Sequence, residues 1–190
     1  IKAKNFHSNL IKSILGISSE KEIEEFQKAN IRVKVIRLSE TNMPKENISF
    51  PAFKFIDIVK EEWDESIFKE VLESKFLFVF FQFDEGLLKL KKVKFWNMPH
   101  DDIETAQHLW DRTREIINED NIVKEIKNGK RKTNFPGMSF NKVSHVRPHG
   151  LNTSDTYPLP IQDKETKANE YTKQCFWLNN SYVRDEIFLK

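Results

Sequence analysis

Several features that mark common protein classes are scarce or missing in this chain of 190 residues. It contains one cysteine, Cys175, which excludes an intramolecular disulfide framework and a cysteine-based zinc site and favours a reducing, cytoplasmic compartment. It has no run of about 18 apolar residues that could span a membrane. Its 31 Lys and Arg residues nearly balance 29 Asp and Glu residues, so the net charge of +2 does not by itself indicate a nucleic-acid partner.

Glycine is also scarce in this sequence. The five glycines supply no G-x-S-x-G, P-loop or G-x-G-x-x-G motif, which excludes hydrolases and phosphate cradles of those types. Aromatic residues, in contrast, are abundant, with 16 Phe, 4 Trp and 3 Tyr within a hydrophobic fraction of 38%. This composition predicts a folded core, in one domain over residues 1–190. Because the chain starts at Ile1 rather than Met, we expect it to be a fragment of a longer protein.

The first half of the sequence predicts two helices followed by a β-sheet. An amphipathic pattern predicts a helix over residues 4–15, and a capping-box pattern predicts a second one over 19–29. Strict alternation over 31–38 predicts a half-buried strand with Arg32 and Lys34 on its polar side. Two prolines in 42–51 predict a loop or an irregular sheet edge. The aromatic run 76–83 predicts a central strand, buried on both faces, that forms a hairpin with 87–96.

The second half predicts one long helix and two short strands. Pro99 and the acidic residues after it are typical of a helix N-terminus. Short strands are predicted at 143–148 and 175–178, a long loop at 150–172, and a closing helix after the last strand. Strands mixed with flanking helices indicate an α/β or α+β domain.

Residue types that could perform catalysis give only weak signals. Cys175 lies in an apolar run and is interpreted as a core residue. His145 and His149 have a spacing that suits a metal on a helix, but Pro148 and the strand pattern exclude that geometry, so no metal site is predicted. Glu-x-Lys, a pattern of metal-dependent nucleases, is expected by chance in so charged a chain. For its best occurrence, at Glu73, a solvated helix end is favoured.

Three segments in the second half are more informative: FWNMPHDDIETAQHLWDRT at 95–113, SHVRPH at 144–149 and TKQCFWLNNSYVRDEI at 172–187. In them the chain resembles the MutH-type family, which includes a mismatch-repair nicking endonuclease and the Sau-type restriction endonucleases that cut GATC. It looks most like the catalytically degenerate C-terminal domain of the Sau-type enzymes. The resemblance implies an α/β fold with a mixed sheet flanked by helices, in a bacterial, cytoplasmic type II enzyme whose N-terminal domain cleaves DNA with Mg²⁺.

The family's catalytic pattern is an aspartate followed about seven residues later by Glu-x-Lys in a strand. The resemblance places Lys34 on the lysine, Arg32 on the glutamate and Glu25 on the aspartate. A guanidinium at the glutamate position would repel Mg²⁺, so no catalytic residue and no cofactor are expected for this domain. Arg32 could instead bind a DNA phosphate. The alternative is that Arg32 and Lys34 form only the exposed face of a strand.

In this family an Arg-Pro loop and a later strand–helix turn enter the major groove of DNA. The resemblance implies that Arg147 and His149 contact bases or phosphates, that Pro148 fixes the loop, and that Trp177 approaches the target adenine, although Trp177 could equally be a core residue. The basic segment 127–132 is interpreted as solvated surface rather than as a backbone contact. The residues expected to contact DNA are Arg32, Lys34, His145, Arg147, Pro148, His149, Lys173 and Trp177.

The leading hypothesis is a double-stranded DNA-binding domain that recognises GATC and acts as the allosteric effector of an N-terminal catalytic domain. Its expected partners are double-stranded DNA and that catalytic domain, with dimerisation on DNA left open and no membrane. Two alternatives stay open. One is an active Mg²⁺-dependent endonuclease that uses Glu25 or Glu73 with Lys34, and the other is a dimerisation module that does not bind DNA.

Overall fold

A computed structural model of the chain describes residues 26, 28–45, 47–119, 122, 126–127, 130–131, 133–164 and 166–190. The chain divides into two compact units. Unit 1 comprises Ile1–Glu46, Ser74–Asn97 and Arg184–Lys190, and unit 2 comprises Asn47–Glu73 and Met98–Val183. Among the described residues, no helix has the length and apolar character needed to cross a membrane.

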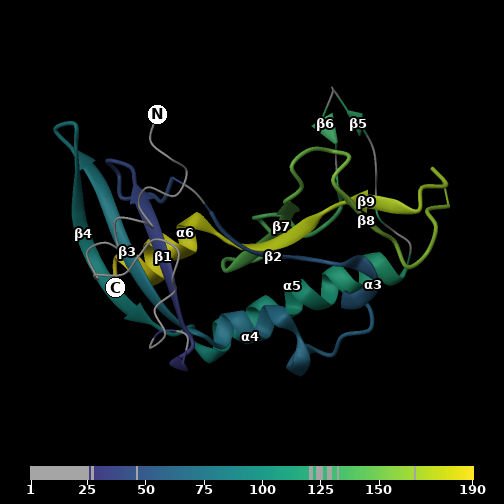
Figure 1. Ribbon diagram of the computed structural model, residues 1–190, viewed down its shortest axis with the longest axis horizontal. Coiled ribbons are helices and arrows are strands. Elements are labelled where there is room, and N and C mark those ends of the chain that lie inside the picture. The colour runs from purple at the N-terminus through teal and green to yellow at the C-terminus, as the bar shows by residue number, and fades with distance from the viewer. Residues whose placement is uncertain are drawn as a thin grey trace. The chain divides into compact units, whose positions relative to one another are not determined.

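Unit 1 is built on a three-stranded sheet in the order β1-β3-β4 (Figure 1). Strand β1 (Ile31–Leu38) is parallel to β3 (Lys75–Asp84), and β3 forms an antiparallel hairpin with β4 (Leu87–Trp96). Residues 76–82 of β3 are all buried, since the run FLFVFF over 76–81 gives apolar side chains to both faces. The predicted central strand and hairpin are confirmed, and the sheet is mixed.

The burial of β1 on the two faces of the unit 1 sheet agrees with the prediction on one face and differs from it on the other. Ile31, Val33 and Val35 pack against buried β3 residues, as the alternation predicts. On the other face, however, Ile36 and Leu38 are only 5% and 1% exposed. The expectation that only one face of β1 is buried is therefore wrong, because this second face also carries the fully buried side chains of Phe76, Phe78 and Phe80 on the paired strand β3. Arg32 and Lys34 share this second face and are half-buried.

Two lysines of β4 bind the end of the closing helical segment, which runs through α6 (Asn180–Tyr182) and a π-helix (Val183–Phe188). The Lys92 Nζ donates to the carbonyl of Phe188 at 2.6 Å, and the Lys94 Nζ donates to that of Ile187 at 3.2 Å. Carbonyls at a helix C-terminus lack partners within the helix and attract cations. These lysines therefore anchor Arg184–Lys190 to unit 1.

Unit 2 contains a second sheet in the order β2-β10-β7. Strand β10 (Gln174–Leu178) is antiparallel to both β2 (Ile48–Phe53) and β7 (Ser144–Pro148). The register between β2 and β10 shifts between Cys175 and Trp177, so that β2 is bulged around Pro51. Proline has no amide hydrogen for a ladder and is tolerated at such a bulge on an edge strand. The irregular edge predicted for 42–51 is confirmed from Ile48 onward.

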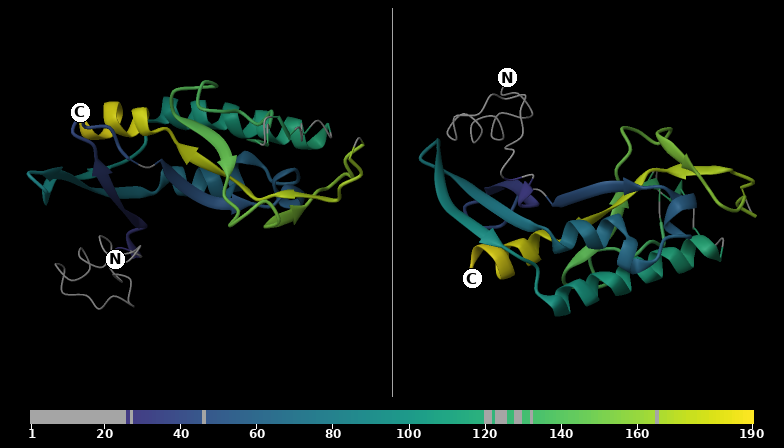
Figure 2. Two further views of the ribbon diagram at one scale, coloured as in Figure 1. Left: turned by 90° about the horizontal axis from the view of Figure 1, so that it is seen from above. Right: turned by 60° about the horizontal axis from the view of Figure 1, so that its bottom comes forward.

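The longest helix, α5 (His100–Asn118), follows Pro99 as predicted and runs along this sheet, as Figure 1 and the two views of Figure 2 show. Its apolar face is buried, with Trp110 only 1% exposed. It contacts α4 (Ile67–Glu73). Shorter turns precede α4, namely α3 (Phe55–Ile58) and a 3-10 turn, η1 (Trp63–Glu65).

The region predicted as one long loop, 150–172, contains a small hairpin. Strand β8 (Thr156–Pro158) pairs with β9 (Glu170–Thr172), so this prediction is wrong at both ends of the segment. A further pair, β5 (Ile126–Lys127) and β6 (Lys130–Arg131), lies in the basic segment. The predicted helix 4–15 lies outside the described residues, as does most of 19–29, of which residues 26 and 28 are helical. The mixed α/β class is confirmed.

Candidate functional site

The antiparallel pairing of β7 and β10 brings most of the predicted DNA-contacting residues together in unit 2. Trp177 lies directly opposite His145, and Cys175 lies opposite Arg147. Paired residues point to the same side of a sheet, and residues two apart on a strand do as well. His145, Arg147 and Trp177 therefore share one face of the sheet.

Trp177 lies on the face opposite to the aromatic core of unit 2. Its neighbour Phe176 stacks on Phe68 with ring centroids 4.1 Å apart and contacts Phe53 at 5.0 Å. Phe176 is only 3% exposed, whereas Trp177 is half-buried. The indole N–H of Trp177 donates to the carbonyl of Arg147 at 3.4 Å, which ties its ring to β7.

Two cationic or polar side chains flank the Trp177 ring. The guanidinium carbon of Arg147 lies 5.7 Å from the ring centroid, within the range of a cation–π contact. The ring of His149 lies 5.5 Å away in an edge-on orientation. Arg147, Pro148 and His149 are exposed, and within the described part of the chain Arg147 has no anionic partner. Its N–H donors are thus available to a ligand.

His145 is buried beneath Trp177 and is not one of the exposed side chains of this surface. The side chain is 3% exposed and stacks on Trp177 at 6.5 Å. Its Nδ1 lies 2.6 Å from the Oδ1 of Asn179, and the Nδ2 of Asn179 donates to the carbonyl of Asn141. Because that second bond fixes the amide orientation, Nδ1 of His145 is the donor. Burial has the largest effect and lowers the pKa of His145; the hydrogen bond with Asn179 opposes it, and the charge of Arg147 adds a smaller lowering.

The buried imidazole of His145 should make stability depend on pH. Its pKa is lowered in the folded chain, whereas an unfolded histidine binds a proton below about pH 6.5. The unfolded state then holds more protons, so the free energy of unfolding should fall as the pH drops below about 6.5, by at most about 1.4 kcal/mol per pH unit. Urea unfolding between pH 5 and 8 should show a smaller dependence in His145→Gln than in wild type. The exposed His149→Gln serves as control, and equal slopes in all three would contradict the prediction.

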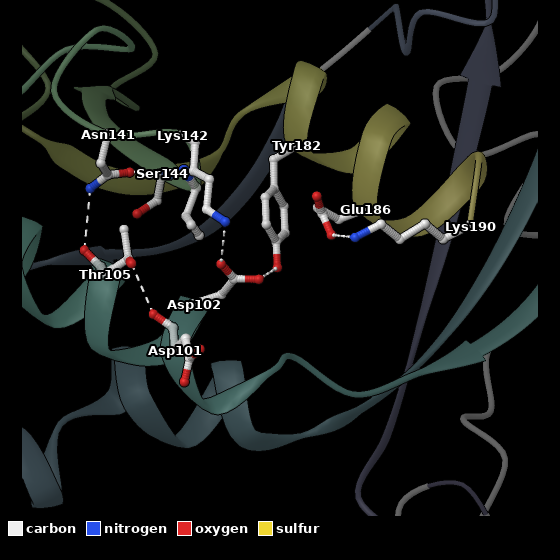
Figure 3. Close-up of polar contacts among 10 residues, drawn as sticks. Asp101, Asp102, Thr105, Asn141, Lys142, Ser144, Tyr182, Glu186 and Lys190 are labelled. Carbon is white, nitrogen blue, oxygen red and sulfur yellow. Dashed lines mark hydrogen bonds and ion pairs between the residues drawn. The ribbon is translucent and has the colours of Figure 1, made fainter.

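Asp102, near the start of α5, binds one residue that precedes β7, Lys142, and one that follows β10, Tyr182 (Figure 3). It is 4% exposed and accepts a hydrogen bond from the hydroxyl of Tyr182 at 2.8 Å. Its other oxygen lies 3.1 Å from the Nζ of Lys142. Asn141, the preceding residue, donates to the carbonyl of Thr105 in α5 at 3.3 Å and accepts the amide hydrogens that begin β7. This network positions β7 and the turn after β10.

Lys173, predicted as a phosphate contact, forms an internal ion pair. Its Nζ lies 2.5 Å from the Oδ1 of Asp155 and 4.7 Å from the ring centroid of Tyr157. The hydrogen bond to Asp155 raises the pKa of Lys173. Whether Lys173 also contacts DNA stays a prediction.

The second predicted location, on β1, lies in unit 1. The Nε of Arg32 donates to the hydroxyl of Ser74 at 2.9 Å. Burial lowers the pKa of Lys34, and the charge of Arg32 lowers it further. The side chains of Arg32 and Lys34 are themselves cationic and supply no ligand to Mg²⁺, which prefers carboxylates. Glu25, the predicted aspartate equivalent, lies outside the described residues, as do the side chains of 127–132.

Glu73 and Cys175, two further residues whose types could perform catalysis, have structural roles. Glu73 lies 3.4 Å from the Nζ of Lys69, which also binds Asp64, in an exposed cluster in unit 2. Burial raises the pKa of the Cys175 thiol to about 12, so at neutral pH it is not a thiolate nucleophile. No group of three or more His, Cys, Asp or Glu side chains suited to a metal ion occurs in the described ranges.

Comparison with known proteins finds one informative similarity. The chain is 34% identical over 194 aligned residues to the type II restriction enzyme Sau3AI of Staphylococcus aureus. The match covers 87% of this chain and 40% of that enzyme, so the chain spans less than half of the relative's length. No family model matches the chain.

Proposed function

We propose that this chain is a double-stranded DNA-binding domain of a type II restriction endonuclease. It recognises GATC and acts as the allosteric effector of a separate N-terminal catalytic domain. The observation that best supports the proposal is the exposed guanidinium of Arg147, which lies 5.7 Å from the centroid of the Trp177 ring and has no acidic partner in the described part of the chain. The similarity to Sau3AI over 40% of that enzyme is consistent with a part of such a protein.

The chemistry of the Arg147–Trp177 surface suits a DNA groove. A guanidinium offers two parallel N–H donors that match O6 and N7 of guanine, and the same fork matches a phosphate. The contact with the half-buried indole of Trp177 would restrict the guanidinium and so reduce the entropy lost when it binds. His149 adds donor and acceptor atoms beside it.

The proposal assigns cleavage to another part of the parent enzyme. Cleavage of a phosphodiester with Mg²⁺ requires carboxylates that hold the ion. On β1, Arg32 stands where the resemblance places a metal-binding glutamate, and its charge already lowers the pKa of Lys34. A divalent cation would add a further positive charge to this pair. Arg32 and Lys34 are therefore proposed to attract a DNA phosphate rather than a metal.

Binding to a GATC duplex tests the proposal directly. The purified chain should shift the mobility of a GATC duplex in a gel, and this binding should weaken as salt rises because phosphate contacts release counterions. The duplex should stay intact with Mg²⁺. A scrambled duplex serves as control, and equal affinity for it would contradict specific recognition. Cleavage by the chain, together with Mg²⁺ binding in calorimetry, would favour the active nuclease. No DNA binding, with a dimer in sedimentation, would favour the dimerisation module.

A further inference from the structure

The loop that follows Arg147 and Pro148 is folded back on itself by main-chain hydrogen bonds. The amide of His149 donates to the carbonyl of Lys173 at 2.9 Å, and the amide of Lys173 donates to the carbonyl of Asp155 at 3.0 Å. The amide of Asp155 donates in turn to the carbonyl of Asn152 at 3.2 Å. Residues 149–155 therefore close onto the start of β10, and we call this segment the 149–155 hook.

The carboxylate of Asp155 holds the hook at two points. One oxygen accepts the amide hydrogen of Leu151 at 3.0 Å, and the other lies 2.5 Å from the Nζ of Lys173. Both side chains of the ion pair are partly exposed, Asp155 at 23% and Lys173 at 27%. The hydrogen bond from Lys173 lowers the pKa of Asp155, so the carboxylate stays charged near neutral pH. Together, these two contacts tie the carboxylate of Asp155 to Leu151 within the hook and to Lys173 just before β10.

Gly150 makes the tight path of the hook possible. A Cβ at this position would lie 2.9 Å from the carbonyl oxygen of Asp155 and 3.0 Å from that of Asn152. These neighbours are main-chain atoms and cannot rotate away. The hook thus depends on three features of different kinds: main-chain bonds, one carboxylate and one glycine.

We infer that Asp155 is a positioning residue that, through the 149–155 hook, fixes His149 beside Trp177 for DNA recognition, and that Lys173 acts through Asp155 rather than on a phosphate. The geometry behind this is direct. His149 is the first residue of the hook, and its ring is held 5.5 Å from that of Trp177. The inference rests on the proposed function, since it assigns a role within the same DNA-binding surface.

The salt dependence of DNA binding separates the two roles of Lys173. Loss of a lysine that contacts a phosphate reduces the slope of log K against log salt by about 1. We expect Lys173→Met and Asp155→Asn each to weaken binding of the GATC duplex about fivefold with the slope unchanged. The double variant should be no weaker than either single one, because both remove the same interaction. Lys173→Arg should restore binding, and Lys60→Met, at an exposed lysine elsewhere in unit 2, serves as control.

A second readout tests the hook without DNA. In proton NMR, the ring current of Trp177 shifts the ring protons of His149, and this shift should decrease in Asp155→Asn and in Gly150→Ala while the other histidine signals stay unchanged. A smaller salt slope in Lys173→Met, or tighter binding by Asp155→Asn, would overturn the inference, as would an unchanged His149 signal. If wild type does not bind DNA at all, the proposed function fails, and the NMR result alone then decides whether the hook exists.

Discussion

Arg147→Ala should weaken binding of the GATC duplex by about 10- to 100-fold and reduce the preference for GATC over a scrambled duplex. Arg147 is the exposed cation of the β7–β10 face, and no acidic side chain in the described ranges competes for its donors. A bidentate contact of a guanidinium with guanine contributes roughly 1–3 kcal/mol of discrimination, which sets the expected size. Fluorescence anisotropy titrations of both duplexes at one salt concentration measure the two affinities.

Arg147→Lys is the matched control for this prediction. It keeps the positive charge but loses the planar fork, so the affinity for the scrambled duplex should be nearly that of wild type while the preference for GATC is lost. The fold should be unaffected, because the side chain is exposed. If Arg147→Ala lowers the affinity for both duplexes equally, Arg147 is a phosphate contact and base reading lies elsewhere.

Phe78→Ala should lower the free energy of unfolding by about 3–5 kcal/mol. Phe78 is 0% exposed in the central strand β3, and it contacts the rings of Phe76, Phe80 and Trp96 at 5.6–5.8 Å. Truncation removes the apolar burial and leaves a cavity that this stack of rings cannot fill. Phe78 is also the β3 partner of Lys34, so the same variant should disturb the cationic pair of β1. Urea unfolding followed by circular dichroism measures the change.

Phe95→Ala supplies the same chemical change in the same sheet at an exposed position. Phe95 is 54% exposed on β4, and the Nζ of Lys75 lies 5.6 Å from the centroid of its ring. Its loss should cost about 1 kcal/mol or less. Similar destabilisation by both variants would mean that β3 is not the core of unit 1.

Much of the fold could be predicted because local patterns determine it. The aromatic run of β3 and the alternation of β4 on either side of a short turn specify a hairpin without reference to the rest of the chain. The acidic first turn of α5 after Pro99 specifies that helix equally well. The burial of Lys34 could not be predicted, since its position in the alternation is the same whether or not other elements cover that face.

For the candidate site, too, short sequence segments identify residues, whereas contacts between segments far apart in the chain cannot be predicted from them. The resemblance directed attention to Arg147, His149 and Trp177, and the structure places their side chains together. The spacing of these residues in the sequence could not predict this proximity by itself, because β7 and β10 pair across a long stretch of sequence. Asp155 and Asn179 were missed altogether, since their roles come from partners that no local pattern identifies. The sequence predicts Asp102 only as one of the acidic residues that follow Pro99, although its carboxylate also accepts a hydrogen bond from Tyr182.

The division of unit 1 into three stretches of sequence has a consequence for how the protein is made. Arg184–Lys190 belongs to unit 1 but follows every residue of unit 2 along the chain. During translation, the N-terminal parts leave the ribosome first, so the β1-β3-β4 sheet emerges long before the carbonyls that Lys92 and Lys94 bind. In a nascent chain these two lysines would lack their carbonyl partners while residues 98–183 of unit 2 are synthesised, and a chain that ended before Arg184 would have a complete unit 2 and an incomplete unit 1.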